Sequence, residues 1–196
     1  MRLTVQSFQR KFDASDPDID AKINEFSTTL IQQIDTMSSI ASAFSSFAKM
    51  PTPKREQLNV VEVVKYALDI FTEDYISFYP KTESIVAELD KTQLIRVVTN
   101  LVKNATHALV EVENKKIEVT VEDRNGDVRI SVADNGKGIN DSDKDKIFEP
   151  KFTTKSSGMG LGLPMVKNIV EAYDGNISFV TELDKGTVFN IILPKK

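Results

Sequence analysis

Apolar residues recur with a seven-residue period between residues 17 and 49, and this pattern predicts one long helix. Alternating spacings of three and four are typical of a coiled-coil or helical-bundle seam. Asp16 can cap this helix, and Pro17 suits its first turn. One row of the seam holds Ile19, Phe26, Ile40 and Phe47, interrupted by Gln33, and the other holds Ile23, Leu30, Met37 and Phe44.

A shorter amphipathic stretch precedes the long helix. Val5, Phe8 and Phe12 stand at helical spacing, so residues 3–12 are predicted to form an antiparallel partner joined through the turn DASDPD. This partner is too short to cover the long seam. We therefore predict a helical hairpin over residues 1–50 that self-associates through the seam. Docking of the long helix on its own globular domain is the alternative.

The stretch KMPTPKREQ is polar and contains two prolines, so residues 51–57 are predicted to be a linker. Residues 58–196 have mixed periodicity, with a turn at Asn125-Gly126 between two alternating stretches. The predicted fold class is α+β: a two-layer α/β sandwich whose mostly antiparallel sheet is covered by helices on one face. The predicted helices span 60–71, 91–112 and 164–172, and the predicted strands span 75–79, 84–89, 116–123, 127–134, 176–182 and 187–193.

The composition excludes several classes of site. The 196 residues include no cysteine and one histidine, which excludes disulfides, thiolate nucleophiles and His-rich metal clusters. A net charge of -4 disfavours sequence-independent nucleic-acid binding. No apolar run approaches the roughly 20 residues that span a bilayer. We expect a cytoplasmic location, and membrane anchoring of a longer parent protein stays open.

The predicted helix 91–112 has two distinct faces. Its core side is expected to hold Leu94, Val98, Leu101, Ala105, Ala108 and Leu109. Asn100, Asn104, His107 and Glu111 fall within an arc of roughly 60° on another side. Asparagine is a poor helix former, and its amide oxygen suits a hard cation such as Mg²⁺. The alternative interpretation is a solvated helix face.

Two glycine-containing segments could approach a ligand closely. ADNGKGI places Asp134 at a strand end beside Gly136 and Gly138, although such a sequence also forms ordinary turns. KFTTKSSGMGLGLP carries two lysines and glycines just before an apolar helix, which is an arrangement that binds anions. A simple surface loop is the alternative for this second segment.

Taken together, the motifs NLVKNATHA, DNGKGI, IFEPKFTTK and GMGLGL resemble the N, G1, F and G2 boxes of the GHKL-type ATP-binding fold. Sensor histidine kinases, gyrase-type topoisomerases, Hsp90-type chaperones and MutL share this fold. The helical stem, ending in FSSFAKMP, resembles the second dimerisation helix of nitrogen-regulatory-type histidine kinases in two-component systems. Residues 1–50 would then be a partial dimerisation and phosphoacceptor hairpin.

The resemblance implies a role for each matching residue. Asn104 would ligate Mg²⁺, with Asn100 supporting the catalytic site and Lys103 and His107 as helpers near the phosphates. Asp134 would accept a hydrogen bond from the adenine amine, and Thr187 would help through a water molecule. The remaining nucleotide-binding positions would be Gly136, Gly138, Ile139, Phe148, Thr154, Lys155, Gly158, Gly160, Leu161 and Gly162.

The chemistry implied by the resemblance is phosphoryl transfer. Hydrolysing relatives carry a glutamate base where this chain has Asn100, and an amide cannot deprotonate water. The expected function is an ATP-dependent histidine kinase core that phosphorylates a histidine and then a response-regulator aspartate. That histidine is absent, because the chain is expected to begin just downstream of the H box, so it is not expected to autophosphorylate. A hydrolytic ATPase and a non-catalytic, nucleotide-gated dimerisation module are the alternatives.

The glycine-rich loop has a further expected property. Residues 151–159 are interpreted as a lid over the nucleotide, with Lys155 supplying charge. We expect this segment to be poorly ordered without nucleotide while Leu161 and Leu163 stay packed.

Overall fold

The computed structural model describes residues 2–12, 16–48, 52–150 and 160–196. The chain divides into two compact units, Met1–Met50 and Pro51–Lys196. Each unit is described by itself below.

The first unit contains two helices, α1 (Arg2–Lys11) and α2 (Ile19–Ala48). Phe8 of α1 stacks on Phe26 of α2 with ring centroids 4.0 Å apart. Asp16 accepts a hydrogen bond from the Asp18 amide at 2.9 Å and forms an ion pair with Lys22, so it caps the start of α2 as predicted. This unit therefore contains two helices in contact, and α1 is much shorter than α2.

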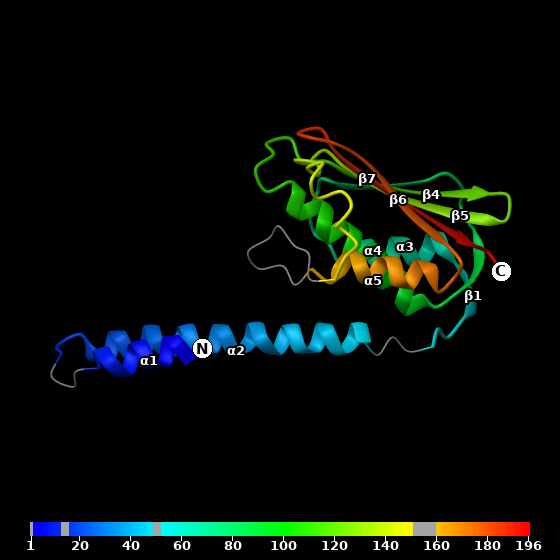
Figure 1. Ribbon diagram of the computed structural model, residues 1–196. Helices are drawn as coiled ribbons and strands as arrows, with labels where there is room; N and C mark the ends of the chain where they lie inside the picture. Colours follow the sequence, from blue (N-terminus) through cyan, green and yellow to red (C-terminus); the bar gives the residue numbers. More distant parts are fainter. Residues whose placement is uncertain (1, 13–15, 49–51, 151–159) are drawn as a thin grey trace. The chain divides into compact units, whose positions relative to one another are not determined.

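The second unit is a two-layer α/β fold (Figure 1). A five-stranded sheet has the order β2-β4-β5-β7-β6, and β1 and β3 form a separate antiparallel pair. Figure 1 shows the three helices of this unit on one face of the larger sheet. The elements are β1 (Glu56–Asn59), α3 (Val60–Leu68), β2 (Ile76–Pro80), β3 (Val86–Leu89), α4 (Lys91–Ala108), β4 (Ile117–Arg124), β5 (Asp127–Asp134), α5 (Gly162–Glu171), β6 (Asn176–Glu182) and β7 (Gly186–Pro194).

Alternation along the strands builds the core of the second unit. Three alternate residues in each of β4 and β5 face the helices and are buried, while the residues between them lie on the opposite face. Most strand neighbours pair antiparallel, and β2 pairs parallel with β4. The predicted fold class is confirmed. The buried strand positions include Ile117, Val119, Val121, Val128, Ile130 and Val132.

The predicted linker 51–57 is wrong at its C-terminal end. β1 begins at Glu56 and pairs with β3, so Glu56 lies opposite Leu89. Arg55 donates a hydrogen bond to the Ala172 carbonyl at 3.2 Å, and its guanidinium lies 4.9 Å from the centre of the Tyr173 ring. Residues 54–57 therefore belong to the folded unit, because tertiary contacts order a sequence whose local composition is that of a loop.

Several predicted helix boundaries also differ from the structure. α4 ends at Ala108 and not at residue 112, because the Leu109 amide bonds to Thr106 in a tighter turn. Glu111 thus lies beyond the helix and does not share the face of Asn100. α3 ends at Leu68, and α5 begins two residues earlier than predicted, at Gly162.

Among the described residues, no helix combines the length and apolar character that crossing a membrane requires.

Candidate functional site

The two asparagines of α4 lie beside the first turn of α5. Asn100 donates its amide hydrogen to the Arg96 carbonyl at 2.7 Å, which turns its Oδ1 atom toward Gly162. A Cβ atom added at Gly162 would stand 3.0 Å from that oxygen and 3.9 Å from Nδ2 of Asn104. Both side chains are half-buried. The packing of α4 on α5 therefore brings two neutral amide groups to the beginning of a helix.

The start of α5 can receive an anion. Leu161 occupies the N-cap position and makes no side-chain hydrogen bond to the first turn. Its side chain is buried, and Leu163 is half-buried, as expected. Amide groups in an uncapped first turn, together with the positive end of the helix dipole, favour negatively charged ligands.

His107 and Lys103 are exposed on the same helix. The Nδ1 atom of His107 lies 2.5 Å from the Lys103 carbonyl, which can only accept, so Nδ1 carries the hydrogen. The neutral ring then presents a lone pair at Nε2. Donation from Nε2 to a phosphate would therefore require the doubly protonated ring, which is a condition that the sequence does not reveal.

Asp134 is the last residue of β5, and the described residues donate hydrogen bonds to only one of its two carboxylate oxygens. Its Oδ1 atom accepts hydrogen bonds from the Gly136 amide at 2.9 Å and from the Thr187 amide at 3.3 Å. No hydrogen bond to Oδ2 is found among the described residues. Burial raises the pKa of Asp134, and the two backbone hydrogen bonds oppose that rise. The residue thus offers a half-buried carboxylate oxygen as an acceptor.

The loop after Asp134 packs tightly against the end of α4. A Cβ atom at Gly136 would stand 2.7 Å from both the Cβ atom and the carbonyl oxygen of Ala108. The Lys137 amide donates to that same carbonyl at 3.2 Å. Gly138 follows, and its neighbour Ile139 donates its amide to Thr181 at 3.0 Å. These contacts join the acidic turn to both α4 and the β6–β7 hairpin.

Thr181 is a hydrogen-bond hub that the sequence interpretation missed. Its hydroxyl accepts from the Ile139 amide, donates to the Gly186 carbonyl at 3.1 Å and lies 3.0 Å from the Thr187 hydroxyl. A hydroxyl has one hydrogen. Because that hydrogen is used on Gly186, Thr187 must donate to Thr181, and the lone pairs of Thr187 remain available. The register of the predicted hairpin, in which Thr181 lies opposite Thr187, is the signal that could have revealed this pair.

Phe148 joins the site to the sheet through aromatic contacts. Its ring centroid lies 6.0 Å from that of Phe179, which in turn lies 5.7 Å from Phe189. The Lys167 ammonium lies 5.8 Å from the Phe148 ring centre. Directly after the predicted lid, Gly160 is described and has a positive φ of 62°. The described residues do not include Thr154, Lys155 or Gly158. The expectation that residues 151–159 are poorly ordered therefore also lies outside the described residues.

The structure thus gathers the predicted residues into two neighbouring groups. One group, at the start of α5, contains Asn100, Asn104 and Gly162. The other, at the end of β5, contains Asp134 and Thr187. Within the described residues, no cluster of three or more His, Cys, Asp or Glu side chains could hold a metal ion by itself.

Comparison with known families agrees with this arrangement. Residues 89–196 match the family described as histidine kinase-, DNA gyrase B- and HSP90-like ATPase. The chain belongs to this ATPase family. The matched region of this ATPase domain includes α4, the acidic turn, α5 and the β6–β7 hairpin, and every described residue of the candidate site lies within it.

Relatives and solved structures place the ATPase domain among sensor histidine kinases. The NtrY-like sensor histidine kinase of Rickettsia conorii is 34% identical over 168 residues, which cover 83% of this chain and 28% of that protein. The catalytic domain of histidine kinase ThkA has a TM-score of 0.65 and 35% identity, covering 72% of this chain and 96% of that domain. A structure of ThkA in complex with the response regulator TrrA has a TM-score of 0.71 and 27% identity, covering 98% of this chain and 55% of that chain. The chain thus resembles sensor histidine kinases but spans less than a third of the Rickettsia relative.

Proposed function

We propose that this chain is the ATP-binding kinase core of a sensor histidine kinase, which transfers the γ-phosphoryl group of ATP to a histidine. The observation that carries this proposal is the chemistry of α4. Asn100 stands beside the anion-binding start of α5, and no carboxylate occurs between Lys91 and Ala108. An amide cannot act as the general base that water attack requires, whereas phosphoryl transfer depends mainly on positioning and charge neutralisation.

The acceptor pair at the end of β5 supports recognition of adenine. Asp134 presents Oδ2, and Thr187 presents lone pairs because its hydrogen is directed at Thr181. Thr187 is only 4% exposed, so its contact would run through a water molecule. Two acceptors favour the exocyclic amine of adenine and disfavour the carbonyl that guanine carries at the same ring position.

The phosphates would lie at the start of α5, beside Asn100 and Asn104. Amide oxygens are hard, neutral ligands, and Mg²⁺ usually takes few protein ligands alongside phosphate and water oxygens. The absence of an acidic cluster among the described residues fits that mode of binding. Asn104 would then hold the ion, with Asn100 in support, and bound Mg²⁺ would supply charge neutralisation.

The phosphoryl acceptor is proposed to lie outside these 196 residues. The only histidine of the chain is His107, which is bonded to its own helix beside the proposed nucleotide site. The response regulator is proposed as the next acceptor, because a structure of ThkA holds the response regulator TrrA. A receiver-domain aspartate would take the phosphoryl group from the histidine.

Dimerisation through the helical unit is part of the same proposal. Along α2, an apolar side chain of the predicted seam remains exposed beyond the stacked Phe8–Phe26 pair, with Met37 at 58%. A second copy of the hairpin would cover this seam. Sedimentation equilibrium should give a dimer for the whole chain and a monomer for residues 51–196.

Calorimetric titration with a non-hydrolysable ATP analogue tests the nucleotide site. We expect Mg²⁺-dependent binding that is lost in Asp134→Ala, and unchanged binding in that variant would contradict the proposal. Phosphotransfer is tested with a longer form of the protein that carries the acceptor histidine. An acid-labile, alkali-stable phosphoryl group is expected, and steady phosphate release without an acceptor would instead identify a hydrolytic ATPase.

A further inference from the structure

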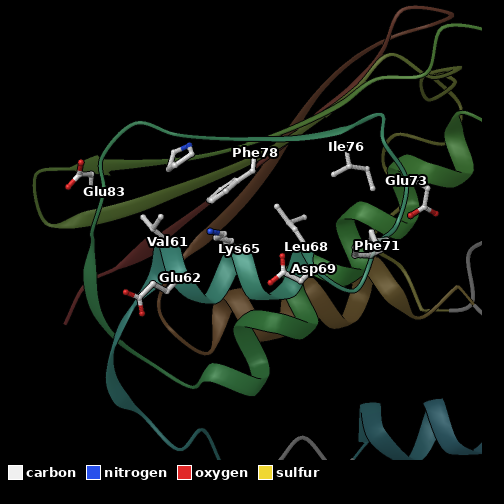
Figure 2. A pocket seen from close by; sticks show the side chains of 11 residues that line it. Val61, Glu62, Lys65, Leu68, Asp69, Phe71, Glu73, Ile76, Phe78 and Glu83 are labelled. Carbon is white, nitrogen blue, oxygen red and sulfur yellow. The ribbon is translucent and has the colours of Figure 1, made fainter.

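A groove between α3 and β2 lies apart from the candidate nucleotide site. It has a volume of about 810 Å³ and shares no residue with either group of that site. Figure 2 shows side chains of α3 and of β2 directed into the same space. Its apolar floor is formed by half-buried residues: Leu68, Phe71, Ile76 and Phe78.

This floor exists because the α/β sandwich is not closed at the β2 edge. Ile76 and Phe78 lie beside Ile117 and Val119 of β4, which are completely buried. The same row of the sheet is therefore covered by helices at β4 and only partly covered at β2. Half-buried aromatic and aliphatic side chains at such an edge gain free energy when a further element covers them.

Four carboxylates and one lysine surround the apolar floor. The carboxylates belong to Glu62, Asp69, Glu73 and Glu83, and the lysine is Lys65. Three negative charges therefore remain without a compensating positive charge in the groove. None of these five residues makes an ion pair among the described residues. Figure 2 shows Glu62 and Glu83 toward one end of the groove and Glu73 toward the other. The groove thus combines an apolar floor with unpaired negative charge at both ends.

We propose that this groove docks a basic amphipathic helix of a partner protein. Positive charge is required because four unpaired carboxylates would repel an acidic segment. A helix is favoured over an added strand because β2 is an edge strand that ends in Pro80, whose missing N–H group disfavours strand pairing. The partner helix lies along α3 and extends the helical layer over the β2 edge.

The spacing of the carboxylates predicts the pattern of the partner. Glu62 and Asp69 are seven residues apart, which corresponds to about 10.5 Å along a helix axis. A partner helix lying alongside α3 should therefore carry Lys or Arg at positions i and i+7. Apolar residues at i+3 and i+4 then face Leu68 and Phe78, because they fall on the same side of the helix as the two charges.

The test is a fluorescence-anisotropy titration of the whole chain with a labelled synthetic helical peptide of this pattern. A second peptide, with glutamate at the two basic positions, serves as the peptide control. We expect saturable binding of the basic peptide only, weakened about fivefold in Glu62→Gln/Asp69→Asn and weakened by added salt. Phe71→Ala should also weaken binding, because it removes part of the floor.

A matched control separates the groove from general acidity. Glu118→Gln/Glu122→Gln removes the same charge from the opposite face of the sheet, and it should change peptide affinity less than about twofold. The groove variants should also bind the ATP analogue as the parent chain does. Absence of saturable binding at about millimolar peptide, or equal weakening by both pairs of substitutions, would overturn the proposal. Self-association of the chain that Glu62→Gln/Asp69→Asn abolishes would overturn it too, in favour of a second copy as the occupant.

Discussion

Thr181→Val is the sharpest test of the acceptor pair, because it removes one hydroxyl and nearly preserves side-chain volume. The substitution leaves the Ile139 amide, the Gly186 carbonyl and the Thr187 hydroxyl without their shared partner. A fully buried group left unsatisfied costs about 1–3 kcal/mol. Thr181 is half-buried and water can reach part of the network, so we expect the free energy of unfolding to fall by about 2 kcal/mol.

The same substitution should change nucleotide selectivity. Once Thr181 no longer accepts from Thr187, the Thr187 hydroxyl is free to donate toward the pocket. The site then loses its purely accepting character beside Asp134. Loss of one hydrogen bond corresponds to about a fivefold weaker affinity for an ATP analogue. The ratio of ATP affinity to GTP affinity should fall as well, because the site no longer repels the guanine carbonyl as strongly.

Thr181→Ser is the matched control, since it retains the hydroxyl and loses only a methyl group. Calorimetric titration with non-hydrolysable ATP and GTP analogues measures selectivity, and urea denaturation measures stability. The expected order is parent, then Thr181→Ser, then Thr181→Val in both measurements. If Thr181→Ser loses as much selectivity as Thr181→Val, or if Thr181→Val keeps the parent ratio, the assignment of the hydrogen atoms is wrong.

Three further predictions concern the same unit. Gly186→Ala and Gly126→Ala impose similar backbone strain, at φ 116° and 112°. Only the Cβ atom at residue 186 would meet a neighbour, the Asp134 carbonyl oxygen at 1.9 Å. In urea denaturation, Gly186→Ala should therefore lower the free energy of unfolding by about 2 kcal/mol more than Gly126→Ala does, and equal losses would contradict the close approach. Burial raises the pKa of Asp134, so its charged form costs stability above the folded-state pKa and that cost disappears as the pH falls toward 3.8. Asp134→Asn should therefore unfold at higher urea than the parent at pH 7, with the difference shrinking on acidification, while binding the ATP analogue more weakly; a lower stability at pH 7 would refute this. Arg55→Ala should lower the free energy of unfolding by about 1 kcal/mol through loss of its contacts with Tyr173 and the Ala172 carbonyl, whereas no change would restore the linker interpretation of residue 55.

The helices and most strands could be predicted because their hydrophobic periods are local properties of the sequence. β4 and β5 alternate strictly, so their buried faces follow directly from the sequence. β1 escaped prediction because Glu56–Asn59 is short and polar, and its pairing with β3 depends on residues about thirty positions away. The parallel pairing of β2 with β4 is likewise a tertiary choice that no local pattern specifies.

The candidate site could be predicted as a set of residues but not as a geometry. Amide and carboxylate side chains at Asn100, Asn104 and Asp134 stand out from their helix or strand by residue type alone. What they present to a ligand depends on hydrogen bonds that residue type does not specify, such as the one that Asp134 accepts from the Thr187 amide. The amide of Asn100 is turned by Arg96, and the ring hydrogen of His107 is fixed by Lys103.

The dipeptide Gly186-Thr187 shows why stability and selectivity should change together in this site. Gly186 lacks the Cβ atom that would collide with the Asp134 carbonyl, so β7 can approach the end of β5. That approach places the Thr187 amide on Asp134 and the Thr187 hydroxyl on Thr181. Substitutions at Gly186 or Thr187 must therefore also disturb the β5–β7 ladder, and their effects on nucleotide affinity and on unfolding should correlate. Substitutions in the α3–β2 groove touch neither contact, so any effect they have on a basic helical partner should occur without a change in nucleotide affinity.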